Sequence, residues 1–261
     1  MNSGQRISAI PAPAAPVLPP VIEGGRPGFL GVLMLDTHFP RPPGDVGHPD
    51  SFGVPVRQKV VSGAWPDKVV ASAAALRGSG LLNTFCAHAI ALEREGAKAI
   101  TTSCGFLVLL QRELQDAVAI PMVTSSLLQL PELLDAQRQV GVLTISAAHL
   151  GEEHLLAAGV PRERLGDVVV QGVARAGEFA GAILGNRYTM DLGKARADVA
   201  GAALALKARA PALRTVVLEC TNMPPYAADI QRETGRPVFD ITTLVRMAHD
   251  ALAGGRPPRP A

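Results

Sequence analysis

Short, continuous apolar runs alternate along this chain with longer segments whose apolar residues recur at helical spacing. The run at residues 29–35 (Phe-Leu-Gly-Val-Leu-Met-Leu) is apolar without alternation, as expected for a strand covered on both faces. Runs of this kind predict strands at residues 29–35, 54–61, 97–101, 118–123, 140–145, 167–170, 214–219 and 237–241. Helical spacing predicts helices at residues 76–95, 106–117, 125–137, 146–158, 192–208, 226–233 and 242–252. Because strands alternate with helical segments, the pattern predicts βαβ units, parallel sheets and an α/β fold.

The chain divides into a proline-rich N-terminal segment and two similar halves. Residues 1–27 are rich in proline and alanine, and we expect a disordered or extended tail there. In each half an apolar strand leads to a cysteine beside small hydroxyl residues: Cys104 follows residues 97–101, and Cys220 follows residues 214–219. Ligands of parallel sheets bind beyond the carboxyl ends of the strands. We therefore expect each half to hold one cysteine toward a shared cleft.

Composition excludes several classes of protein. Of the 261 residues, 48% are hydrophobic and 18% are charged, so the chain can bury a sizeable core. The net charge of +2 comes without a lysine or arginine cluster, and only 4% of residues are aromatic, so we expect no nucleic-acid partner. No apolar run is long enough to span a membrane, and prolines break the N-terminal stretch that could otherwise be a secretory signal. Three cysteines, a small and odd number, fit a reducing, cytoplasmic location.

Two cysteines at strand ends suit proton transfer at a carbon atom. A helix N-terminus lowers the pKa of a thiol from its usual value of about 8.5, and we expect Cys104 and Cys220 to occupy such positions. One thiolate would remove a proton from one face of the substrate carbon, and the other thiol would return a proton to the opposite face. Amides and hydroxyls would stabilise the carbanion between these steps. The candidate substrate-binding residues are Asp36, Thr102, Ser103, Gly105, Thr221 and Asn222.

Three motifs resemble the aspartate/glutamate racemase superfamily. They are Gly-Val-Leu-Met-Leu-Asp at residues 31–36, Thr-Thr-Ser-Cys-Gly-Phe at residues 101–106 and Glu-Cys-Thr-Asn-Met-Pro at residues 219–224. The third motif is similar to the family's Gly-Cys-Thr-X-X-Pro, with Glu219 in place of the glycine. The resemblance covers most of residues 28–252.

The fold that this resemblance implies has two pseudosymmetric α/β lobes, each a parallel sheet flanked by helices, with the active site in the cleft between them. Residues 28–124 and 236–255 would form the first lobe, because the C-terminal end of the chain packs back on that lobe in the family. Residues 125–235 would form the second lobe.

The activity that the resemblance implies is racemisation or epimerisation of a small acidic amino acid without pyridoxal phosphate, any other cofactor or a metal. Cys104 and Cys220 would be the acid–base pair of this reaction. Asp36 matches the acidic residue after the family's first strand, and Thr221 matches its substrate-contacting threonine. The expected partner is a small carboxylate or amino-acid substrate, and a homodimer is the default expectation for the assembly.

Other functions remain open for the same pocket. A cis–trans isomerase of the maleate type would use one thiolate as a nucleophile. A relative of malonate decarboxylases is a second alternative, although decarboxylating relatives keep one of the two cysteines and this chain has both. A non-catalytic protein that binds small acids is a third.

Several other residues have structural interpretations. Cys86 lies within a predicted helix, and we expect a packed core thiol there. Residues 39–51 are rich in proline and glycine and predict a functional loop, in which Arg41 and Asp45 could pair with each other or contact the substrate. We expect the histidines to be structural or solvated, with His38, near Asp36, as the candidate exception.

Overall fold

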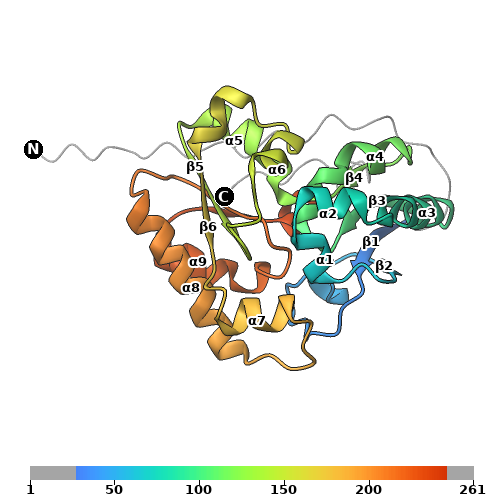
Figure 1. Ribbon diagram of the computed structural model, residues 1–261, viewed down its shortest axis with the longest axis horizontal. Coiled ribbons are helices and arrows are strands. Elements are labelled where there is room, and N and C mark those ends of the chain that lie inside the picture. The colour runs from blue at the N-terminus through green and yellow to red at the C-terminus, as the bar shows by residue number, and fades with distance from the viewer. Residues whose placement is uncertain (1–27, 246–261) are drawn as a thin grey trace, which may run out of the picture.

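Residues 28–245, the part of the chain that the computed structural model describes, form two lobes, each built on a four-stranded parallel sheet (Figure 1). This arrangement confirms the expected α/β class and the two-lobed architecture. The expected tail at residues 1–27 and the C-terminal residues 246–261, including most of the last predicted helix, lie outside the described residues.

The first sheet has the strand order β2-β1-β3-β4. Its strands are β1 (Phe29–Leu35), β2 (Val56–Val61), β3 (Ala97–Thr102) and β4 (Met122–Val123). The helices of this part of the chain are α1 (Pro66–Val70), α2 (Ala73–Gly78), α3 (Leu81–Arg94) and α4 (Gln111–Asp116), with 3₁₀ helices η1 (Pro49–Ser51) and η2 (Gly105–Leu110). The strand with Pro121 before it, β4, lies at the edge of the sheet, where a missing N–H is tolerated.

Every residue of β1 is buried because both faces of the first sheet are covered. On one face, Leu33 belongs to the main core together with Phe85 and Leu92 of α3. On the other face, Leu30 and Val32 pack in a cluster with residues 241–245, which are helical. The C-terminal end of the described chain therefore packs on the first lobe.

The second sheet has the strand order β6-β5-β7-β8. Its strands are β5 (Val140–Thr144), β6 (Val168–Gly172), β7 (Val216–Leu218) and β8 (Val238–Phe239). The helices are α5 (Leu130–Ala136), α6 (Glu152–Ala157), α7 (Glu178–Leu184), α8 (Leu192–Arg209) and α9 (Ala227–Thr234), with 3₁₀ helices η3 (Ser126–Gln129), η4 (Arg162–Asp167) and η5 (Pro224–Tyr226). Because β8 pairs with β7, residues 238 and 239 lie in the second sheet, and the C-terminal segment joins the first lobe only after them.

The two sheets repeat one topology. In each, the first strand of the lobe lies between the second and third, and the fourth follows the third at the edge. Cys104 follows the third strand of the first sheet, and Cys220 follows the third strand of the second. The pseudosymmetry therefore places the two cysteines at equivalent positions.

Some predicted helices are broken where the backbone departs from helical geometry. The helix predicted at residues 76–95 is interrupted because Gly80 adopts a left-handed conformation with φ of 73°, which separates α2 from α3. The helix predicted at residues 106–117 begins as the fully buried 3₁₀ helix η2 and becomes α-helical only at Gln111. The helix predicted from residue 146 begins at Glu152, after a turn in which the carbonyl of Ser146 accepts two backbone bonds.

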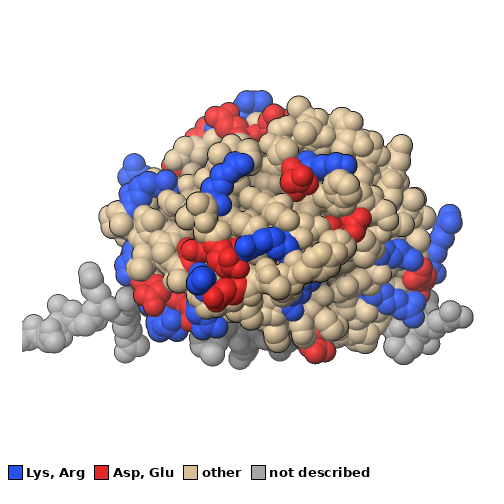
Figure 2. All heavy atoms as spheres, turned by 60° about the horizontal axis from the view of Figure 1, so that its bottom comes forward, with Lys and Arg blue, Asp and Glu red and all other residues tan. Residues whose placement is uncertain are grey.

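Charges of both signs lie interspersed on the face of the molecule that Figure 2 shows. Several charged side chains of the described residues form ion pairs, for example Arg77 with Glu153 at 2.6 Å. Within residues 28–245, none of the helices combines the length and the apolar character needed to cross a bilayer.

Candidate active site

Both cysteines line one small cavity between the lobes, with a volume of about 20 Å³. Its walls come from the carboxyl ends of the strands of both sheets and from α1 and α7. The polar or small lining residues are Thr37, Ser103, Cys104, Gly105, Glu219, Cys220, Thr221 and Asn222. The remaining lining residues are apolar, among them Phe39, Phe106, Ile145 and Ile183. The cavity therefore has mainly apolar walls, and its polar groups come from the residues next to the two cysteines.

Cys104 sits where β3 passes into η2, and its backbone is still extended. Its thiol is buried, and burial raises the pKa to about 12, with the charge of Glu219 as the next cause. The backbone amides of Phe106 and Leu107 act in the opposite direction and lower the pKa of the thiol. These amides are the groups that would stabilise a thiolate here.

Cys220 does not lie at the start of a helix, contrary to expectation. Residues 220–223 form a turn closed by the bond from the Met223 amide to the Cys220 carbonyl, and the 3₁₀ helix begins at Pro224. Two prolines lack N–H groups and have fixed φ, so they suit the first positions of a helix and delay its start. Burial raises the pKa of Cys220 well above its usual value, and Glu219 raises it further, while the Asn222 amide lowers it. The expected lowering of the pKa is therefore wrong for both cysteines, because burial outweighs the amides.

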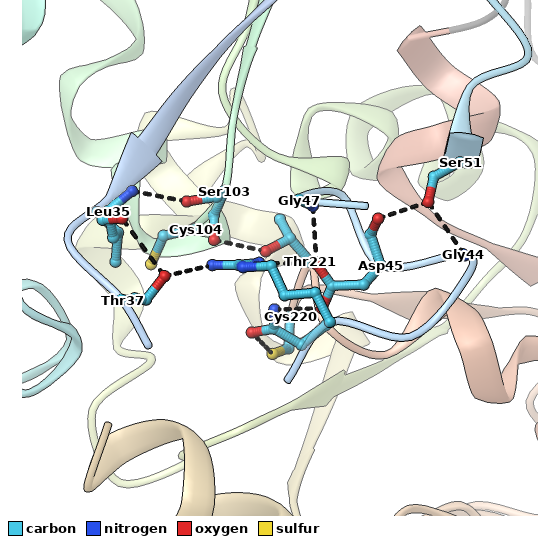
Figure 3. A network of polar contacts seen from close by, with 12 residues as sticks. Leu35, Thr37, Gly44, Asp45, Gly47, Ser51, Ser103, Cys104, Cys220 and Thr221 are labelled. Carbon is cyan, nitrogen blue, oxygen red and sulfur yellow. Dashed lines mark hydrogen bonds and ion pairs between the residues drawn. The ribbon is translucent and has the colours of Figure 1, made fainter. Parts of the chain in front are cut away.

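Hydrogen bonds tie the two strand ends together across the lobes. The Thr221 hydroxyl donates to the Ser103 carbonyl at 2.7 Å, and the Ser103 hydroxyl accepts from the Leu35 amide at 2.8 Å (Figure 3). The chain after Cys220 is thereby bonded directly to the chain before Cys104. Figure 3 shows both sulfur atoms beside this network. Cys104 belongs to the first lobe and Cys220 to the second.

The loop at residues 39–51 contributes a buried ion pair beside Cys220. Arg41 Nη1 donates to Asp45 Oδ1 at 2.7 Å, and Arg41 Nη2 donates to Thr37 at 2.8 Å. The other oxygen of Asp45 accepts from Asn222 Nδ2 at 2.7 Å, and the Cys220 thiol lies 3.6 Å from Asn222 Oδ1 as its donor. Arg41 and Asp45 therefore pair with each other, which is one of the two roles expected for them. The pair is buried, and Asn222 connects it to the Cys220 thiol.

The other predicted residues have different places. Asp36 and Thr102 are not among the cavity-lining residues: the Asp36 carboxylate accepts from the Gly63 amide at 3.0 Å, and the Thr102 hydroxyl bonds to the carbonyl of Thr124 at 2.8 Å. His38 is exposed and stacks on Tyr188, with ring centroids 4.9 Å apart.

Cys86 lies outside the cavity as well. It is half-buried in α3 and points its thiol at the Glu113 carbonyl. This placement separates it from the two cysteines of the cavity.

Glu219 is a site residue that the sequence marked only as a departure from the family's glycine. Its side chain is fully buried, its Oε2 accepts from the Thr144 hydroxyl at 2.7 Å, and burial raises its pKa to about 8. The sequence did contain one indication of this role. Glu219 is a charged residue at the end of an apolar strand, directly before a candidate catalytic cysteine.

Replacing Gly105 with alanine is expected to destabilise the protein. A Cβ there would lie closer than 3.0 Å to the backbone oxygen and the carboxyl group of Glu219, and the backbone cannot yield easily. We expect a loss of about 1–3 kcal/mol in the free energy of unfolding, measured by urea titration. The matched control is Gly201→Ala, which has open space around its Cβ within helix α8 and should be neutral or stabilising. Equal unfolding midpoints for the two variants would contradict the close approach at Gly105.

Comparison with known proteins places this geometry in a family. The family model described as Asp/Glu/Hydantoin racemase matches residues 70–248. A dimethylsulfoniopropionate lyase from Durusdinium sp. clade D is 30% identical over 217 residues, which are 81% of this chain and 70% of that protein. Dimethylsulfoniopropionate lyase 5 from Emiliania huxleyi (strain CCMP1516) is 30% identical over 234 residues, 85% of this chain but only 45% of that protein.

A solved structure supports the fold alone. Unliganded arylmalonate decarboxylase superposes with a TM-score of 0.53 at 16% identity, over 89% of this chain and 97% of the other. Because the sequence identity is low, this similarity says nothing about the reaction of the present chain.

Proposed function

Because the chain belongs to the Asp/Glu/hydantoin racemase family, we propose that it is an enzyme that removes a proton from the carbon next to a carboxylate, with a cysteine as the base. The observation that carries this proposal is that Cys104 and Cys220, at equivalent positions of the two lobes, line one cavity. Burial keeps both thiols protonated at rest, and the backbone amides that lower their pKa would stabilise the thiolate that forms when one cysteine acts as the base.

For the substrate, we favour dimethylsulfoniopropionate or a close analogue. The base would take a proton from the carbon next to the carboxylate, and its electron pair would form the new C=C bond. The C–S bond would then break with its electron pair on sulfur, which releases dimethyl sulfide and leaves acrylate. Two relatives described as lyases of this compound are 30% identical over more than four-fifths of the chain.

The walls of the cavity suit such a substrate. A dimethylsulfonium group carries a positive charge but has no N–H or O–H donor, so it needs apolar and aromatic neighbours rather than hydrogen-bond acceptors. Phe39 and Phe106 provide aromatic surface, and Ile145 and Ile183 provide aliphatic surface. The α-ammonium group of an amino acid would need several acceptors in the same space.

Racemisation of a small acidic amino acid is the second candidate, and the paired cysteines favour it. Inversion of a stereocentre needs one group on each face of the carbon, whereas elimination needs a single base. The pseudosymmetric placement of Cys104 and Cys220 would provide both faces.

One experiment separates the two candidates. The purified protein is incubated in deuterated water with dimethylsulfoniopropionate and, separately, with both enantiomers of aspartate and glutamate. We expect equal amounts of dimethyl sulfide and acrylate from the first, measured by gas and liquid chromatography. Deuterium at the α-carbon of an amino acid, seen by mass spectrometry without dimethyl sulfide release, would favour racemisation instead. Absence of both reactions would contradict the proposed function.

A further inference from the structure

We propose that Glu219 is a further catalytic residue, which donates a hydrogen bond from its Oε1 hydroxyl to the carboxylate of the substrate and stabilises the charge that develops there when the proton leaves. The inference rests on the proposed function, because it assigns a role in the same proton abstraction to a third group of the cavity.

The carboxyl group of Glu219 lies at the junction of the two lobes. Its residue directly precedes Cys220 at the end of β7, and none of its surface is exposed. Thr144 at the end of β5 contacts the carboxyl group from the second lobe, and the Gly105 backbone approaches it from the first. The same residue lines the cavity together with both cysteines. A substrate between the sulfur atoms would therefore lie beside this carboxyl group.

The two oxygens of this carboxyl group are not equivalent. Oε2 accepts the hydrogen bond from Thr144, whereas Oε1 has no hydrogen-bond partner among the residues that the structure describes. Burial raises the pKa of the group to about 8, so it is protonated at neutral pH. Since Oε2 serves as an acceptor, the proton belongs on Oε1. The result is a buried O–H donor beside the Gly105 backbone, on a residue that lines the cavity, and no atom of the described residues accepts its hydrogen bond.

Several other polar side chains of the cavity already donate hydrogen bonds to protein acceptors. Thr221 donates to the Ser103 carbonyl, Asn222 donates to Asp45, and Thr37 donates to the Leu35 carbonyl. Within residues 28–245, the lining contains no lysine, arginine or histidine that could bind a carboxylate by charge. Among the described lining residues, the Glu219 hydroxyl is therefore one of the few buried side-chain donors left for the substrate, together with the Ser103 hydroxyl, the second N–H of Asn222 and the Cys104 thiol.

The charge state of Glu219 matters because its neighbours also titrate. Cys104 faces it from the first lobe and Cys220 from its own strand, and an ionised Glu219 raises the pKa of both thiols. Arg41 and Asp45 of the loop at residues 39–51 are the next charges around the two thiols. A neutral Glu219 exerts no electrostatic repulsion on the thiolate or on the substrate carboxylate. An ionised Glu219 repels both. The group is thus useful only below a pH of about 8.

The test compares Glu219→Gln with Glu219→Leu. In the glutamine variant the amide oxygen can accept from Thr144 while the amide nitrogen donates into the cavity at every pH. With dimethylsulfoniopropionate as substrate, we expect the leucine variant to lose about 10²–10³-fold in kcat, as for the loss of one donor to a developing charge. The glutamine variant should keep most of the activity and lose the fall in rate that the wild type shows above a pH of about 8.

Two readouts do not depend on turnover. Calorimetry with acrylate should show binding to the wild type and the glutamine variant but much weaker binding to the leucine variant. The folded protein binds a proton at Glu219 that the unfolded chain releases above a pH of about 4.5, so the wild type should lose stability relative to Glu219→Gln as the pH rises from 4.5 to 8. Gln137→Leu is the control, because Gln137 is a buried amide with an unpartnered oxygen that is not part of the cavity lining. It should change stability without changing the pH profile or acrylate binding.

The outcomes separate this inference from the proposed function. If the leucine variant binds acrylate as well as the wild type, or if the wild type does not bind it, the assignment of Glu219 is wrong. It is also wrong if the glutamine variant keeps the alkaline fall in rate. If cysteine variants keep full activity while both Glu219 readouts change as expected, the cysteine base fails but the carboxyl donor stands.

Discussion

Serine in place of Cys104 or Cys220 is expected to lower kcat/KM by about 10²–10⁴-fold, the usual contribution of one acid–base group. A serine hydroxyl preserves the shape of the thiol but is a much weaker acid than a thiol in the same surroundings, so it forms an anion far less readily. Both side chains are buried in the cavity wall, so water cannot easily replace the missing base. Steady-state kinetics with dimethylsulfoniopropionate, and α-deuterium exchange with amino acids, measure the loss.

The relative size of the two losses identifies the reaction. Elimination needs one base, so one serine variant should lose much more activity than the other. Racemisation needs both groups, so the two variants should lose similar activity. Cys86→Ser is the control, because Cys86 is half-buried in α3 and lies outside the cavity lining. Full activity in both cavity variants would exclude cysteine as the base.

Alanine in place of Asp45 is expected to cost about 3–5 kcal/mol of stability, because it removes the carboxylate from a buried ion pair. Asp45 is only 1% exposed and Arg41 only 12% exposed, so the guanidinium would keep its charge without its partner. The amide of Asn222 would also lose its acceptor. Since Asn222 accepts from the Cys220 thiol, we expect the variant to lose activity in addition to stability. Urea unfolding and kinetics at a temperature where the variant is folded measure the two effects.

The control for Asp45 is an ion pair of similar length on the surface. Arg77 and Glu153 are 2.6 Å apart, with side chains 51% and 60% exposed, and Glu153→Ala should cost at most about 1 kcal/mol. If Asp45→Ala unfolds at the same urea concentration as Glu153→Ala, the network does not stabilise the loop at residues 39–51.

Much of the fold could be predicted because its signals are local. The unbroken apolar run of β1 reflects burial on both faces, and the similar segments before Cys104 and Cys220 reflect equivalent strands of two sheets. Errors arose where one residue changed the local geometry, as Gly80 did by its left-handed conformation and Pro224 by delaying a helix.

The roles of the polar residues around the cysteines could be predicted only in part. Asp36 and Thr221 both follow strands, yet only Thr221 lines the cavity, while Asp36 bonds to the turn after β2. Sequence patterns give the position of a side chain along a strand, but not the partner that it meets from another part of the chain. Glu219 shows the same limit, since its importance depends on Thr144 and Gly105, which are far from it in sequence.

By itself the sequence determined the α/β class, the two similar halves and the delivery of one cysteine by each, because strand and helix periodicity depend on near neighbours. The tertiary structure alone decided that the cysteines share a cavity, that their thiols are held protonated by burial and that a neutral carboxyl group lies beside them. These properties arise from contacts such as Thr221 with Ser103 and Asn222 with Asp45, which join residues 118 and 177 positions apart. The pKa of a group follows its desolvation and its neighbouring charges, and both exist only after the lobes have come together.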